Sequence, residues 1–375
     1  MRSHWILCLV IAISTSAFGG QRVTVQELTQ SLISLHKAGK SDAEVAASLQ
    51  KLQLSEELTA GQAAALQQYV PGSLSLDQLA VLRGLSAFEP AAPSQPPASP
   101  APDAAAQSAL LARTGTWMTT AFGQTPTVTV SKVMDSFQED AQSSTHGSQA
   151  DADSNYSRHS GERTDTVEIA QGVEKTVNPG PKVNWGPNGQ ISEVEPPPSL
   201  PELLQAASAF GKPAFSRWEI IDGKSTAVFT FSVEKKKSHY SVEFCCFPIS
   251  DTPSVGGGFG GSAPIIAPGT STNSTSWKPF KKVVPFHGLL YIDPDSGAIV
   301  RTVTYAELKP FEYVHGEEER VDYATETVGG KACVVPVRSV TLNEIVPGAD
   351  TQPKSYPVRR ELISAEYANY RLAAQ

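Results

Sequence analysis

Hydrophobic and polar residues alternate with a period of two over much of the second half of the chain. Residues 285–308 read PFHGLLYIDPDSGAIVRTVTYAEL, and residues 320–340 read RVDYATETVGGKACVVPVRSV. Two alternating runs flank the DPDSG sequence at 293–297, and two more flank the glycine pair at 329–330. Alternation around tight-turn residues is typical of antiparallel hairpins with one buried face. We therefore predict a twisted antiparallel sheet built by successive hairpins.

Other segments extend this prediction toward both ends of the region. An Asp-Gly turn at 222–223 separates two strand-like runs. Two segments with helical patterns, 103–122 and 199–210, interrupt the strands, and we expect residues 356–370 to add an edge strand. The remaining strand-like runs are 125–133, 163–171, 217–221, 227–233 and 240–247.

The first part of the mature chain has helical spacing instead. Apolar residues three and four apart, such as Leu28, Leu32 and Leu35, place one apolar stripe along a helix. Ser41 and Glu44 form a capping-box sequence at the start of a second helix. A third helix is predicted over 59–69 and a fourth with Ser75 as its cap, its inward residues being Leu76, Leu79, Leu82 and Leu85. Four short helices predict a small bundle.

Composition divides the chain into these two parts. Residues 89–102 read EPAAPSQPPASPAP, and proline at this density predicts an extended linker that lets the two domains move with some independence. A segment near 251–277, rich in Gly, Ser, Thr and Pro, is predicted to be disordered. The predicted class is α+β, with a helical domain at 22–88 and an antiparallel β domain at 103–375. Its sheet is of the kind that also forms incomplete barrels.

Residues 1–19 predict where the protein is located. Arg2 precedes a short apolar core that ends in small residues, which is the pattern of a cleaved secretory signal peptide. We therefore expect a periplasmic or extracellular protein, peripheral to a membrane at most. Removal of Arg2 changes the net charge from −8 to −9. An acidic chain without a dense basic patch argues against nucleic acid as a partner.

Three cysteines remain after cleavage, an odd number for an oxidising compartment. Alternation places Cys246 on one face of the run 240–247, and Cys333 shares a face with Val335 and Val337. If both faces point inward, a Cys246–Cys333 disulfide is the natural pair. A strained bond between Cys245 and Cys246 is the alternative, and one thiol stays free in either case.

No motif predicts a cofactor or a catalytic centre. The serine-hydrolase elbow, the zinc-protease motif and the phosphate loop are absent from the sequence, and the glycine run at 256–261 lacks the lysine of a phosphate loop. Residues 151–162 carry oxygen-bearing side chains at the spacing of a calcium loop, but Tyr156 occupies the position that needs glycine. His287, Asp293, Asp295 and Arg301 invite a catalytic interpretation, yet turn chemistry accounts for the aspartates. We therefore predict a protein that is not an enzyme.

Several of these segments carry a resemblance to known families. The two hairpin segments, together with SHYSVEFCCFP at 238–248 and SDAEVAASLQKLQLSEELT at 41–59, resemble a group of secreted proteins of acidobacterial type whose function is not known. More distantly, the hairpin around DPDSG is similar to hairpins of outer-membrane lipoprotein carriers and of the periplasmic regulator that senses mislocalised lipoproteins. That resemblance implies an incomplete antiparallel barrel around an apolar cavity that holds acyl chains. It transfers no individual site residue.

Two functions from different classes follow, with a hydrolase as a lesser alternative. The first is a non-enzymatic cell-envelope protein whose curved sheet binds an apolar ligand, a lipid or a lipidated peptide. An ordinary packed core is the competing explanation for its lining residues. The second is an interaction module whose helical domain binds an envelope protein. The predicted lining residues of the first are Trp218, Phe229, Phe231, Tyr240, Phe244, Leu289 and Tyr291.

Overall fold

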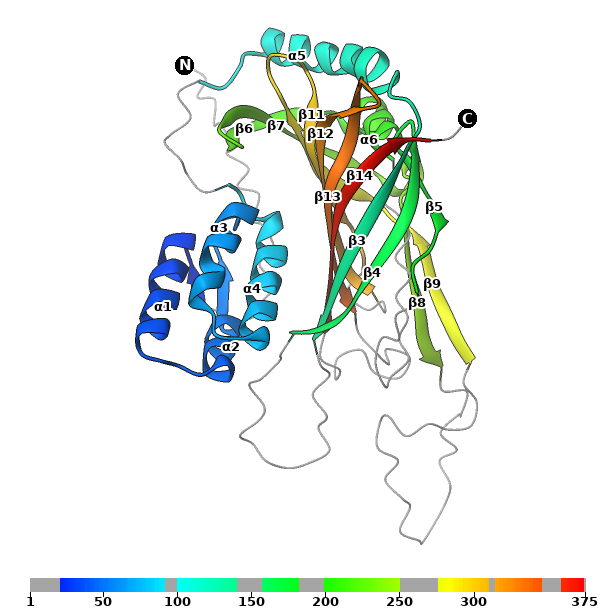
Figure 1. Ribbon diagram of the computed structural model, residues 1–375. Helices are drawn as coiled ribbons and strands as arrows, with labels where there is room; N and C mark the ends of the chain where they lie inside the picture. Colours follow the sequence, from blue (N-terminus) through cyan, green and yellow to red (C-terminus); the bar gives the residue numbers. More distant parts are fainter. Residues whose placement is uncertain are drawn as a thin grey trace, which may run out of the picture.

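The computed structural model describes seven segments of the chain, and Figure 1 shows their arrangement. The predicted signal peptide and nearly all of the predicted disordered insertion lie outside them, as do the glycine run and residues 92–99 of the predicted linker. The described residues are 21–91, 100–139, 157–181, 199–249, 276–309, 314–345 and 359–373.

The first described segment is the helical domain, and its four helices confirm the predicted bundle. Leu28, Leu32, Val45, Leu49 and Leu58 form its core and are almost completely buried. Two short strands that were not predicted pair in parallel beside the helices. The elements are β1 (Gln21–Val23), α1 (Val25–Lys37), α2 (Asp42–Gln50), β2 (Leu52–Leu54), α3 (Ala60–Leu66), η1 (Gln67–Tyr69), α4 (Ser73–Leu85) and η2 (Ser86–Phe88).

Side-chain capping accounts for one helix start and corrects another. The Ser41 hydroxyl accepts a hydrogen bond from the backbone of Glu44, whose carboxylate accepts one from the backbone of Ser41, so the predicted capping box forms. The prediction that Ser75 caps the fourth helix is wrong, because α4 already begins at Ser73. The Ser75 hydroxyl instead donates to Asp42 at 2.5 Å. Leu76, which was predicted to point into the core, is 39% exposed in the structure.

The β domain contains one ten-stranded sheet in the order β5-β4-β3-β14-β13-β12-β11-β10-β7-β6, with every neighbouring pair antiparallel. The two ends of this order do not pair, so the sheet stays open. A separate hairpin consists of β8 (Ser241–Ile249) and β9 (Ser276–Val283). The sheet strands are β3 (Val128–Glu139), β4 (Ser157–Ala170), β5 (Val173–Asn178), β6 (Ala214–Ile221), β7 (Lys224–Val233), β10 (Phe286–Ile292), β11 (Ile299–Ala306), β12 (Val314–Val328), β13 (Lys331–Ile345) and β14 (Arg359–Leu372).

The predicted turns join the strands as expected. Asp222 and Gly223 both have positive φ, as do Gly329 and Gly330, which is the backbone of a type I′ hairpin turn. The Asp293 carboxylate accepts hydrogen bonds from the backbone of Asp295 and Ser296. One prediction about order fails: β14 lies in the middle of the sheet, between β13 and β3, and is not an edge strand.

The two faces of the sheet are covered by different elements. We call inner the face that contacts α6 (Leu200–Ala206), and outer the face that contacts the helical domain (Figure 1). α5 (Ala104–Trp117) and α6 each continue into a π-helical turn, η3 (Met118–Phe122) and η4 (Ala207–Gly211). π-helical turns are rare in proteins, but those that occur are often found at functional sites.

The helical domain packs closely on the outer face. Val81 and Ala87 of α4 and η2 are buried against Phe137, Val340 and Leu362 of the sheet. A buried ion cluster of Glu57 with Arg301 and Arg320 lies beside this apolar contact. The linker sequence predicted that the two domains move with some independence. In the structure they are instead packed together through buried contacts.

Candidate functional site

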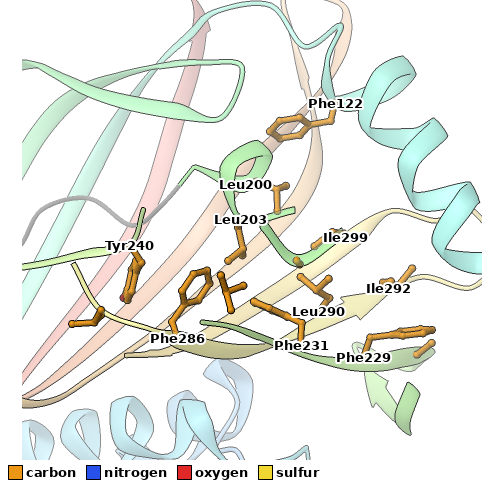
Figure 2. Packing of buried hydrophobic residues seen from close by; sticks show 14 of the residues in the cluster. Phe122, Leu200, Leu203, Phe229, Phe231, Tyr240, Phe286, Leu290, Ile292 and Ile299 are labelled. Atoms are coloured by element: carbon orange, nitrogen blue, oxygen red, sulfur yellow. The ribbon is translucent and has the colours of Figure 1, made fainter. Parts of the chain in front are cut away.

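The inner face is apolar toward β7, β10 and β11. Phe229 and Phe231 of β7 alternate with residues of the outer face and join Leu290 and Ile292 of β10. Leu200, Leu203 and Ala207 of the α6–η4 segment lie against these side chains, as Figure 2 shows for Leu200 and Leu203. The Ser199–Glu202 capping box starts α6 at this point. This half of the inner face is thus covered by α6 and η4, and Leu110 and Trp117 of α5 belong to the same buried cluster.

The predicted lining residues separate into two groups. Phe229, Phe231 and Tyr240 belong to the inner apolar cluster, and Trp218 packs against it. Leu289 and Tyr291 lie on the outer face, among residues that include Phe88 of the helical domain. The prediction placed them with the others as large apolar side chains of the sheet. On β10 they alternate with Gly288 and Leu290, which face inward. The side chain of Phe244 lies outside the described residues.

Little free volume remains beside α6. A cavity of about 30 Å³ lies between α6, η3 and the strands on the β5 side of the sheet, which is space for about one water molecule. An acyl chain therefore fits only if the α6–η4 segment moves away from the sheet. The cavity is lined by Phe122, Ile169, Gly172, Glu174, Ser199, Leu200, Val321, Tyr323, Val334, Pro336 and Tyr367.

The inner face becomes polar beyond this cavity. Lys132 Nζ lies 2.6 Å from a carboxylate oxygen of Glu174, and the Tyr367 hydroxyl donates to the other oxygen at 2.8 Å. Burial alone would lower the pKa of Lys132, but Tyr367 and Glu174 raise it above its usual value. The three side chains are thus partners in one ion pair and one hydrogen bond, and the Lys132 ammonium group is paired with Glu174.

Two acidic residues on β12 face the same interior. Glu317 and Glu319 are only 7% and 6% exposed. The Tyr240 hydroxyl donates to Glu317 at 2.7 Å, and Tyr240 also belongs to the apolar cluster. Burial raises the pKa of Glu317 to about 7 and holds the pKa of Glu319 well above its usual value. Sequence alternation in HGEEERVDY gave no sign of this pair, because three consecutive glutamates read as a solvated run.

The residues considered for catalysis have structural roles. Asp293 orders its turn, and His287 is half exposed, with its ring stacked on Tyr305 and one nitrogen 3.3 Å from Glu307. Arg301 contacts Glu57 and Asp322 on the outer face. The structure therefore separates His287, Asp293 and Arg301 into three settings. Ser157, His159 and Glu162 of the calcium-like spacing lie in β4, an extended strand that does not wrap a cation.

The structure does not form the predicted Cys246–Cys333 disulfide. Cys333 is a free and buried cysteine, and burial raises the pKa of its thiol. A β-bulge between Phe244 and Phe247 interrupts the alternation on which the pairing argument depended. The side chain of Cys246 lies outside the described residues.

A groove of about 400 Å³ runs along the helical domain, away from the sheet contacts. Val25 and Thr29 of α1 form part of it, and α3 and η1 contribute Ala65 and Tyr69. Among the described residues, no group of His, Cys, Asp and Glu side chains could hold a metal ion. No helix in the same segments is long and apolar enough to cross a membrane.

Comparison with known proteins adds little to this geometry. No family model matches the chain, and no curated protein matches it. A LolA superfamily protein from Nitrosomonas europaea matches at a TM-score of 0.19 with 11% identity, over 72% of this chain and 94% of that one. A TM-score of this size is too low to support a shared fold or ligand, and we draw nothing from it.

Proposed function

We propose that the protein is a non-enzymatic cell-envelope protein that binds an apolar or lipidated ligand on the inner face of its sheet. The supporting observation is that the α6–η4 segment packs on the apolar half of this face, beside side chains of α5. Leu200, Leu203 and Ala207 supply contacts that a hydrocarbon chain would otherwise make. The α6–η4 segment occupies the site in the unliganded protein and leaves it when the ligand enters.

Two features of the α6–η4 segment fit such an exchange. The segment is a short helix followed by a π-turn, whose wide hydrogen-bond spacing is a weak point in a helix. Its end is at Lys212, a residue in the left-handed region with φ of 46°. A non-glycine residue in that region stores strain that a change of backbone conformation releases. The signal-like N-terminus and the distant resemblance to lipoprotein carriers agree with an envelope location.

Extraction of the purified protein with organic solvent, followed by mass spectrometry, tests the proposal. We expect a lipid or an acylated peptide in stoichiometric amount, or stoichiometric binding of 1-hexadecanol by the delipidated protein in native mass spectra. A protein that carries no lipid and binds no 1-hexadecanol would leave the apolar cluster as an ordinary core.

The second candidate is a partner-binding role of the helical domain, favoured by the groove between α1 and α3. Deleting the domain would expose buried sheet residues, so a substitution is the sharper test. Ala65→Arg places a charge in the groove, whereas Ala64→Arg places it on an exposed position outside the groove lining. Loss of a co-purifying envelope protein with Ala65→Arg alone would support this candidate, and equal recovery with both variants would reject it.

A further inference from the structure

The structure assigns the acidic end of the inner face as a subsite for the cationic head of an amphiphilic ligand, such as a primary amine. This inference rests on the proposed function and names the class of ligand. The subsite consists of Glu317, Glu319 and Asn343, with Tyr240 at its border to the apolar cluster. The hydrocarbon chain would lie beneath α6, and the head would lie on β12 and β13.

The three side chains project from one face of the sheet. Glu317 and Glu319 are two residues apart on β12, a spacing that directs both side chains to the same side. Asn343 of β13 lies directly opposite Glu317 in the register, so its side chain projects to that side as well. Tyr240, which directly precedes β8, reaches the group and donates to Glu317.

The hydrogen-bond balance of this group lacks donors. Asn343 is only 2% exposed, and its Oδ1 atom has no hydrogen-bond partner among the described residues. In the same segments, no side chain or backbone group donates to Glu319. Tyr240 supplies one donor to Glu317, and Lys132 is held by Glu174. Buried acceptors without donors are costly, and an ammonium group offers the three donors and the charge that they lack.

The position of the group connects it to the proposed ligand site. Tyr240 packs its ring against Phe286 of the apolar cluster, at a centroid distance of 5.2 Å, while its hydroxyl meets Glu317. Val321, which follows Glu319 on the same face, lines the small cavity beside α6. The acidic group therefore borders the apolar region at both Tyr240 and Val321. A ligand with a chain and a cationic head would span this border.

Protonation competes with the cation at this subsite. Burial raises the pKa of Glu317 to about 7 and also raises the pKa of Glu319 well above its usual value, so the empty site binds protons at neutral pH. An alkylamine stays cationic in this range, and its binding should release a proton to the buffer. The charged and titratable groups that face Glu319 or its neighbours from other elements are Lys132 of β3, Glu174 of β5, Tyr240 just before β8, and Tyr367 and Glu361 of β14.

Calorimetry with decylamine and decanol, which differ only in the head group, tests the assignment. We expect decylamine to bind about tenfold more tightly than decanol, as for one charge-assisted hydrogen bond. Titrations in two buffers of different ionisation enthalpy should show proton release with decylamine only. Glu319→Gln should remove both the preference and the proton release, and Glu317→Gln should weaken them.

Glu318→Gln is the matched control, because Glu318 lies on the same strand and projects to the outer face. It should keep the preference for decylamine. Equal affinities for the two probes would overturn the cationic subsite while leaving the apolar site in place. A preference that survives Glu319→Gln would overturn the role of that residue. If neither probe binds, the proposed function is rejected together with this inference.

Discussion

Glu57 of the helical domain and Arg301 of the sheet form a buried ion pair with a distance of 2.9 Å between Oε2 and Nη1. Arg320 lies on the same carboxylate at 2.7 Å and also donates to the carbonyl oxygen of Ala87 at 2.8 Å. Asp322 completes the cluster by contacting both arginines. Burial would raise the pKa of Asp322, but Arg301 and Arg320 hold it below its usual value. The helical domain is thus joined to the sheet by charges that neither part satisfies alone.

Glu57→Gln should therefore destabilise the protein strongly. The substitution keeps the shape of the side chain but leaves Arg301 and Arg320 buried with one carboxylate between them. Breaking a buried ion pair in this way costs about 3–5 kcal/mol, which urea unfolding measures. Glu234→Gln, which removes the exposed pair with Lys236, should cost less than about 1 kcal/mol. If both variants lower the free energy of unfolding by the same amount, the buried cluster does not stabilise the contact between the two domains.

Glu317 should make the protein less stable as pH rises. Its pKa is about 7 in the folded state and 4.5 in the reference state, so the folded protein binds the proton more tightly. Folding is unaffected below about pH 4.5, and stability then falls between about pH 4.5 and pH 7. The full shift corresponds to about 3 kcal/mol.

Glu317→Gln should remove this loss, so the variant should gain stability over the original protein at about pH 8 and not at about pH 4. Glu318→Gln should act in the same direction, because burial raises the pKa of Glu318 to about 7 as well. Thermal unfolding across this pH range measures both. Parallel stability curves for the original protein and Glu317→Gln would contradict a buried carboxyl at this position.

Gly288→Ala should disturb the apolar cluster. A Cβ atom at Gly288 would lie 2.3 Å from the carbonyl oxygen of Val303 and 2.7 Å from the Phe231 ring. Overpacking of this kind costs about 1–3 kcal/mol. Gly115→Ala in α5 is the control, since its Cβ would meet no atom within 4 Å and alanine favours helix, so it should stabilise by up to about 1 kcal/mol. Denaturant unfolding that ranks the two variants in the opposite order would show that Phe231 does not lie over Gly288.

The Cys333 thiol should resist alkylation in the folded protein, because it is buried and burial raises its pKa. After denaturation without reductant, iodoacetamide should modify Cys333 completely, as peptide mass mapping would show. A Cys333 that becomes reactive only after reduction would restore the disulfide predicted from the sequence.

The sequence predicts local features of this fold better than long-range ones. Turn residues and capping boxes act between neighbours, so the hairpin turns at 222–223 and 329–330 and the Ser41 cap are found where expected. The position of β14 between β13 and β3 depends on pairing across the whole domain, which no local pattern specifies. The start of α4 was misplaced because Asp42, distant in sequence, takes the Ser75 hydroxyl.

The candidate site was predicted in part for a related reason. Alternation shows that Leu289 and Tyr291 share a face, but not which face is inner. Both faces of β10 are buried, one by α6 and the other by the helical domain, so both carry large apolar side chains. Tyr291 is on the outer face, where its ring lies under Arg301, at 5.4 Å from the guanidinium carbon. The acidic pair Glu317 and Glu319 was missed because a run of glutamates in the sequence indicates exposure to solvent. Only the structure shows that two of these side chains are buried.

Movement of the α6–η4 segment is the central claim, and a reversible cross-link tests it most directly. A Cβ atom at Gly211 would lie 3.1 Å from the Cβ atom of Phe231, close to the spacing of about 3.5–4.5 Å in disulfides. The double variant Gly211→Cys/Phe231→Cys should therefore link η4 to β7 when oxidised. Phe231→Cys alone, treated in the same way, is the control for oxidation of the native cysteines and for the loss of the Phe231 ring.

Binding of 1-hexadecanol by the delipidated double variant, followed by native mass spectrometry, is the measurement. We predict that the oxidised form binds no 1-hexadecanol, and that reductant restores binding to the level of the Phe231→Cys control. Equal binding by the oxidised and reduced forms would contradict the claim that the ligand takes the place of the α6–η4 segment.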